Sequence, residues 1–154
     1  MNLTQGEALV YHSFHAYEPF KGPIPGRALG VLVSSETGVA VPYALFGLRD
    51  RGPMFVAPGA AVYEGMIVGE HCKDNDLVVN LSREKKLTNV RSSTKESFVK
   101  IQPPRIFGVE EALEYVGEGE YVEITPANVR LRKVHLKETD RRREDRAATK
   151  AGSI

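Results

Sequence analysis

The chain has 154 residues, of which 42% are hydrophobic and 27% charged, and its formal net charge is +1. These values exclude a disordered polyelectrolyte and predict one globular domain, or one domain plus a fragment, with a substantial core. Because the charge is nearly balanced, any contact with a polyanion must come from local basic patches. The sequence has no apolar run of membrane-spanning length, no signal-peptide pattern and one cysteine, Cys72, so we expect a cytoplasmic protein without an internal disulfide.

The first half of the chain reads as short strands separated by glycine and proline turns. Residues 1–17 fit either an apolar strand or the tail of a neighbouring unit, and residues 18–26 a loop. Residues 27–34 and 39–45 are predicted to pair as a hairpin. A helical turn is expected at 48–52, ending at Gly52. Further strands are predicted at 54–56, 62–69, 77–79 and 98–101.

The second half adds helical signals. Residues 109–116 are predicted to form a helix whose apolar face carries Val109, Leu113 and Val116, with Ala112 beside them. Strands are expected at 121–124 and 129–132, on either side of a turn. A polar helix from Asp140 to Ala148, capped by Thr139, should precede a disordered tail. The predicted fold class is α+β: a mainly antiparallel curved sheet or partly open β-barrel with one or two short helices.

The strongest functional pattern is the basic, polar stretch 79–95, which contains one acidic residue, Glu84. Lys and Arg neutralise phosphates, and Ser, Thr and Asn donate hydrogen bonds to phosphate and sugar oxygens. A loop of this composition between ordered flanks suits insertion into RNA. It contains no aromatic residue, so base stacking is not expected to be its main contact. The alternative is a solvated surface loop whose charges only keep the protein soluble.

Residues 130–146 form a second cluster, in which Lys and Arg outnumber Asp and Glu. It fits either a phosphate-contacting arm or a solvated, salt-bridged terminus.

Other chemistries find little support in the sequence. His12 with His15, and His71 with Cys72, do not have zinc-site spacing, so no metal is expected. Cys72 with His71 or His135 could form a nucleophilic pair, but neighbours on a strand point to opposite faces. Residues 74–76 predict a turn rather than a calcium loop. No phosphate-binding glycine loop occurs, so no nucleotide hydrolysis is expected from this chain.

Several blocks of the sequence closely resemble the C-terminal part of the TypA/BipA translational GTPases. The blocks are YALFGLRDRG (43–52), APGAAVYEGMIVG (57–69), DNDLVVN (74–80), KLTNVRS (86–92), PPR (103–105), EEALEY (110–115) and VEITPANVRLRK (122–133). The resemblance runs from about residue 6 to 146. It implies a junction from a preceding elongation-factor-like domain at 1–20, the unique C-terminal domain at 21–137, and a basic helix and tail at 138–154.

The resemblance also implies a function. Members of the family associate with the bacterial ribosome and are linked to stress adaptation and large-subunit assembly. A loop of their C-terminal domain reaches toward the peptidyl-transferase centre and the acceptor end of A-site tRNA. Carried over by motif, the RNA-binding residues are Arg83, Lys85, Lys86, Thr88, Asn89 and Arg91. The basic C-terminus makes Arg141, Arg142 and Arg143 a second RNA contact.

We therefore expect a non-catalytic, monomeric, ribosome-binding domain that contacts rRNA and A-site tRNA. No cofactor is expected in it, because GTP would be bound by a domain outside this sequence. The main alternative is a protein-docking module for ribosomal proteins or for the factor's other domains. A small hydrolase using Cys72 is a third hypothesis.

Overall fold

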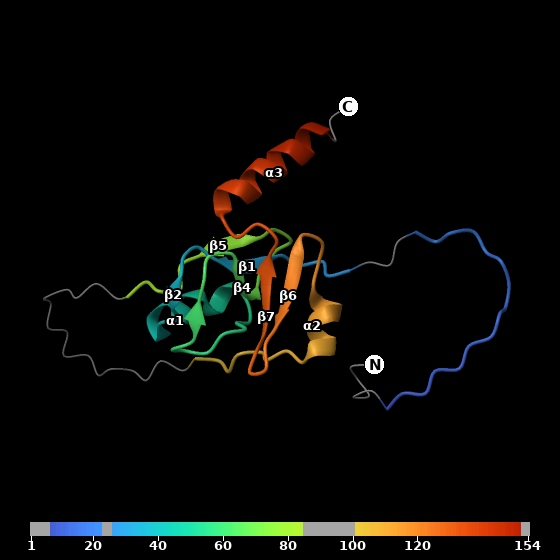
Figure 1. The fold of residues 1–154 in the computed structure, drawn as a ribbon, viewed down its shortest axis with the longest axis horizontal. Helices are drawn as coiled ribbons and strands as arrows, with labels where there is room; N and C mark the ends of the chain where they lie inside the picture. Colours follow the sequence, from blue (N-terminus) through green and yellow to red (C-terminus); the bar gives the residue numbers. More distant parts are fainter. Residues whose placement is uncertain (1–6, 23–25, 85–100, 152–154) are drawn as a thin grey trace, which may run out of the picture.

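The computed structural model describes residues 7–22, 26–84 and 101–151 (Figure 1). Its centre is an open sheet of five strands in the order β5-β1-β4-β7-β6. β1 pairs with β4, β4 with β7 and β7 with β6 in antiparallel register, while β1 and β5 are parallel. The strands are β1 (Val31–Ser34), β4 (Met66–Glu70), β5 (Leu77–Val79), β6 (Glu120–Ile124) and β7 (Val129–Lys133). The predicted α+β class with a mainly antiparallel sheet is confirmed.

β1 is the middle of the core because all four of its residues are buried. Its side chains alternate between the two faces of the sheet, as the period of a strand requires. Leu32 packs with Leu45 of helix α1 (Pro42–Leu48), whereas Val31 and Val33 pack with Ala112 of helix α2 (Val109–Tyr115). The sheet therefore lies between two apolar clusters, each covered by one short helix.

The prediction of a strand at 39–45 is wrong. Only Gly38–Val39 forms a strand, β2, and it pairs with β3 (Ala61–Val62) in a separate two-stranded sheet. The chain then enters α1, with Pro42 in the first turn. Proline lacks the N–H that pairs with a neighbouring strand. In the first turn of a helix the N–H groups have no partner within the helix, so proline is tolerated there. The antiparallel partner of β1 is consequently β4.

The strand predicted at 62–69 is divided at Gly65. β3 ends at Val62 and β4 begins at Met66, and between them Gly65 has a φ of 83°. The Gly65 N–H donates to the Ser34 carbonyl (3.0 Å), and its own carbonyl accepts from Lys133 N–H (2.9 Å). A Cβ atom placed on Gly65 would lie 2.6 Å from Leu136 Cα. The position therefore requires glycine for both its conformation and its space.

Gly65→Ala is expected to lower the free energy of unfolding by about 3 kcal/mol. This loss combines the strain of a positive φ with the clash between the new Cβ atom and the backbone of Leu136. Gly59→Ala is the matched control, because Gly59 has nearly the same φ (82°) and no neighbouring atom within 4 Å of a Cβ placed there. Its expected cost is the strain alone, about 1–2 kcal/mol. Urea denaturation measures both. Equal losses would contradict the proposed contact with Leu136.

The helix predicted at 109–116 is confirmed as α2, but one residue of its predicted apolar face, Leu113, is not buried. Leu113 is 59% exposed, whereas Ala112 is fully buried. The cause is an aromatic cluster: the Tyr115 ring packs edge-on against Phe55 (centroids 5.5 Å apart) and lies 5.0 Å from Phe107. The half-buried Tyr115 takes the place against these rings, and Leu113 faces solvent.

The remaining elements differ from prediction mainly at their ends. The turn η2 (Arg49–Arg51) ends at Gly52 as predicted, and Met54 forms a single bridge to Gly69 instead of a strand. Helix α3 begins at Glu138, before the predicted cap Thr139, and continues past Ala148 to Ala151. Figure 1 shows α3 projecting away from the sheet. Residues 98–100 of the strand predicted at 98–101 lie outside the described residues, and Ile101 is not in a strand.

Residues 7–22 contain neither a helix nor a strand, so the strand option is wrong for the described part of the N-terminal segment, residues 7–17. Figure 1 shows this segment extending away from the sheet. Its large apolar side chains are exposed, with fractions between 75% and 95%. They are Leu9, Val10, Tyr11, Phe14, Tyr17 and Phe20.

Candidate functional site

The chain that enters the predicted RNA-binding loop is fixed up to Leu81. This side chain is fully buried, and its carbonyl accepts a hydrogen bond from Val41 N–H (2.9 Å). Just before it, the Val79 carbonyl accepts from Ser35 N–H (2.9 Å). The loop therefore begins at a point held by both packing and backbone hydrogen bonds.

The chain that leaves the loop is fixed as well. Ile101 packs against the same apolar cluster that contains Leu81. Farther on, Arg105 N–H donates to the Met54 carbonyl (2.9 Å), and Phe107 is buried. Both ends of the loop thus return to one apolar cluster.

The structure places only part of the predicted loop site. Arg83 is exposed, two residues after the buried Leu81. The other predicted RNA-binding residues lie outside the described residues: Lys85, Lys86, Thr88, Asn89 and Arg91. Their assignment as phosphate and sugar contacts stays a prediction.

The three predicted arginines of α3 differ in their surroundings. Arg141 donates from Nη1 to the carbonyls of His135 (2.8 Å) and Leu136, so it fixes the start of the helix. Arg142 pairs with Glu138 (2.5 Å), and Arg143 lies 3.8 Å from Asp140. The last two side chains are 68% and 83% exposed, and exposed pairs of this kind contribute little. Arg142 and Arg143 can therefore exchange their carboxylates for phosphate at low cost.

Sequence reasoning missed an ionic cluster at the end of β6 and β7. The buried Glu120 carboxylate accepts from Arg27 through both oxygens (2.7 and 3.0 Å) and from Lys133 (2.8 Å). Lys133 also pairs with Asp76 (2.6 Å), which in turn accepts from Val31 N–H (2.9 Å). These charges are far apart in the sequence, so no local pattern could reveal them. The cluster ties together four distant segments of the chain.

This cluster favours the charged forms of Glu120 and Arg27. Burial alone would raise the pKa of Glu120, but hydrogen bonds from Arg27, Lys133 and Gly117 N–H bring it below its usual range. Burial likewise opposes the charge of Arg27, yet the Glu120 carboxylate raises the pKa of that guanidinium. All the strong partners are internal, so the cluster reads as a structural one rather than as a binding site.

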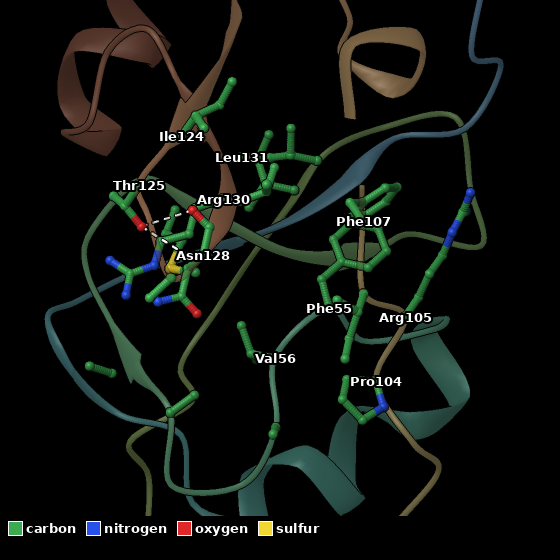
Figure 2. Close-up of a pocket in the computed structure, with 18 of the residues that line it drawn as sticks. Phe55, Val56, Pro104, Arg105, Phe107, Ile124, Thr125, Asn128, Arg130 and Leu131 are labelled. Carbon is green, nitrogen blue, oxygen red and sulfur yellow. Dashed lines mark hydrogen bonds between the residues drawn. The ribbon is translucent and has the colours of Figure 1, made fainter. Parts of the chain in front are cut away.

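Sequence reasoning also missed a groove of about 690 Å³ between the β6–β7 hairpin and two loop segments. Figure 2 shows Phe55, Pro104 and Phe107 on one side of it, and Ile124, Asn128 and Leu131 on the other. The lining comes from residues 55–57, 60–61, 66–67, 104–107, 109 and 124–131. No sequence signal pointed to it, because these segments meet only in the fold.

The remaining candidates show no assembled chemistry. His71 is buried and its Nδ1 lies 2.6 Å from the Asn75 carbonyl, whereas the neighbouring Cys72 is exposed. The two side chains therefore have different surroundings, as their positions in the sequence predicted. In the described ranges, no group of three or more His, Cys, Asp or Glu residues is placed to hold a metal ion. Nor does any described helix have the length and apolarity needed to cross a membrane.

Comparison with known proteins decides the family. The family described as the TypA/BipA C-terminal domain matches residues 29–138, which include the whole sheet and both of the helices that cover it. The chain belongs to this family. The resemblance seen in the sequence is thereby confirmed.

Curated TypA/BipA relatives match almost the whole chain. The large ribosomal subunit assembly factor BipA of Bacillus subtilis is 49% identical over 153 residues, which is 99% of this chain and 25% of that protein. The proteins of the same name from Escherichia coli K12 and Haemophilus influenzae are 47% and 45% identical, over 96% and 97% of this chain and 24% of each relative. The chain thus spans about a quarter of the length of these TypA/BipA proteins.

Proposed function

We propose that this TypA/BipA C-terminal domain binds the ribosome and contacts RNA through the loop that follows Leu81, without catalysing a reaction itself. The observation that carries the proposal is the anchoring of both loop ends on one apolar cluster, through Leu81 and Ile101. A loop with fixed ends loses less conformational entropy on binding than a free segment does. The name of the relatives, large ribosomal subunit assembly factor, supplies the partner.

The proposed roles follow from the side chains. Lys86 and Arg91 neutralise backbone phosphates, assisted by Arg83 and Lys85 at the base of the loop. Thr88 and Asn89 make polar contacts with sugar or phosphate. A second contact comes from α3, where Arg142 and Arg143 are exposed. Arg141 would act indirectly, because it holds the start of that helix. By family resemblance, the RNA includes the acceptor end of A-site tRNA.

The same resemblance assigns the exposed N-terminal segment. We propose that residues 1–20 are the junction to a preceding domain, which would cover apolar side chains such as Tyr11, Phe14 and Tyr17. GTP would be bound by another domain of the longer TypA/BipA proteins. Because its proposed partner is the ribosome, the domain would act in the cytoplasm.

Salt dependence tests the RNA contact. Association of the chain with purified large ribosomal subunits is expected to weaken steadily as KCl rises, with a log–log slope of about −0.7 to −0.9 for each phosphate contacted. Sedimentation with the subunits measures the bound fraction at each salt concentration. Bovine serum albumin, added as a non-binding protein, corrects for trapping. An affinity that does not change with salt would contradict the proposal.

The second candidate function, a protein-docking module, is favoured by a separate observation, the apolar groove beside the β6–β7 hairpin.

A further inference from the structure

The groove lies where the sheet divides. β4 pairs with β7 only at Met66 with Arg132 and at Ile67 with Leu131. Continued pairing would bring Val68 opposite Arg130, but the Val68 carbonyl accepts instead from Phe55 N–H (2.8 Å). The chain at Phe55 thus replaces β7 beside β4, and the β6–β7 hairpin diverges from it. The groove occupies the space between these two extended segments.

The walls of the groove are mainly aliphatic. Ala57, Ala60, Pro104, Pro126 and Ala127 line it together with larger apolar side chains. Two residues of the lining are large and apolar and yet exposed to solvent: Ile106 at 82% and Ile124 at 58%. Exposed apolar surface around a concave site is typical of a protein-binding surface.

The charge of the groove is one-sided. None of the described residues that line it is acidic, and two are arginines, Arg105 and Arg130. Arg105 is paired with Glu111 (2.6 Å). Arg132, which lies two residues from Arg130 on the same face of β7, forms an ion pair with the carboxylate of Glu123 (2.7 Å). Within the described part of the chain, Arg130 has no carboxylate partner, so the groove presents one cation available to a ligand.

These features favour a peptide over RNA. The two aromatic rings in the lining, Phe55 and Phe107, pack edge-to-face against each other (centroids 4.7 Å apart) and offer no free pair of planes for base stacking. An RNA strand also carries one negative phosphate per nucleotide, and the groove offers a single unpaired cation to neutralise them. An extended peptide instead places alternate side chains on one face and can carry a single acid.

We propose that the groove binds an extended segment of a partner protein, with apolar side chains at alternate positions and one acidic side chain that reaches Arg130. The apolar side chains would fill the space between Phe55 and Leu131, and the rim residues Ile106 and Ile124 would close over them. The proposal does not rest on the RNA contact, because it involves a different surface and a different ligand.

The test uses the ¹⁵N-labelled chain and two pools of synthetic heptapeptides, which alternate Thr with Val, Ile or Phe. One pool carries a single Glu at a Thr position and the matched pool carries Lys there. The Glu pool is expected to shift the backbone amide signals of residues 55–57 and 127–130, with an affinity about fivefold higher than that of the Lys pool. Arg130→Gln should remove this preference. Lys73→Gln, which removes an exposed cation outside the groove, should retain it.

Several outcomes would overturn the proposal. One is the absence of shifts at these amides with millimolar peptide, and another is a Glu preference that survives Arg130→Gln. Stronger shifts of the same amides by octauridylate would assign the groove to RNA. Shifts that depend on the concentration of the chain alone would assign it to a second copy. Because no ribosome is present, these results are independent of the salt titration.

Discussion

Replacing Glu120 with glutamine is expected to lower the free energy of unfolding at pH 7 by about 3 kcal/mol. The carboxylate side chain is fully buried and accepts hydrogen bonds from Arg27 and Lys133, whose side chains are only 16% and 12% exposed. Glutamine keeps the shape but leaves the largely buried Arg27 without its carboxylate partner and Lys133 with Asp76 alone. Removing one partner of a buried ion pair is costly for this reason, even where the intact pair contributes little.

The loss should also depend on pH in a defined direction. The pKa of Glu120 is lower in the folded chain than in the unfolded chain, because Arg27 and Lys133 stabilise the carboxylate. Its contribution is therefore complete above the unfolded pKa, about 4.3, and is lost as the pH falls through the lower folded value. The difference in stability between the wild-type chain and Glu120→Gln should be constant from about pH 7 to 5 and should shrink below about pH 4.

Urea denaturation monitored by circular dichroism measures this difference at each pH. Glu118→Gln is the matched control, because Glu118 is exposed and close to Glu120 in the sequence. Its expected effect is within about 0.5 kcal/mol. Equal losses for the two variants, or a Glu120 effect that grows as the pH falls, would contradict the role assigned to the ionic cluster.

The sequence predicted those elements whose local pattern agrees with their place in the fold. The alternating residues of β7 and the apolar positions of α2 identified both elements close to their observed ends. Prediction failed where a long-range contact decided the outcome. Val39–Leu45 looks like a strand, but the chain enters a helix with Pro42 in its first turn. Leu113 occupies an apolar helical position, but it is the half-buried Tyr115 that packs against rings from other parts of the chain.

The candidate sites divide in the same way. The composition of the basic loop and the family motifs can be read from neighbouring residues, so the sequence alone raised the RNA hypothesis. The cluster around Glu120 and the groove beside Arg130 are assembled from segments that are distant in the chain. The main-chain hydrogen bonds of Arg141 are equally invisible in the sequence, where it looks the same as Arg142 and Arg143. Such sites become evident only once the topology is known.

The double replacement Lys86→Ala/Arg91→Ala is expected to weaken association with the large ribosomal subunit by about tenfold for each residue. Both side chains are assigned to backbone phosphates, so their loss should also make the salt slope shallower by about 1.4 to 1.8. The matched control is Arg51→Ala/Lys73→Ala. It removes the same charge from two residues that are also exposed. These two residues lie close to each other, because the N–H of Cys72 donates a hydrogen bond to the Arg51 carbonyl (2.7 Å). This control should keep the wild-type slope and affinity to within about threefold.

Chemical probing of large-subunit RNA, with the wild-type chain and the two double variants at equal occupancy, measures the loop contact directly. We expect the wild-type chain to protect nucleotides near the peptidyl-transferase centre. The Lys86→Ala/Arg91→Ala chain should lose those protections, and the Arg51→Ala/Lys73→Ala chain should keep them. An unchanged pattern of protection in the Lys86→Ala/Arg91→Ala chain would show that another surface makes the contact, and it would contradict the function proposed for the loop.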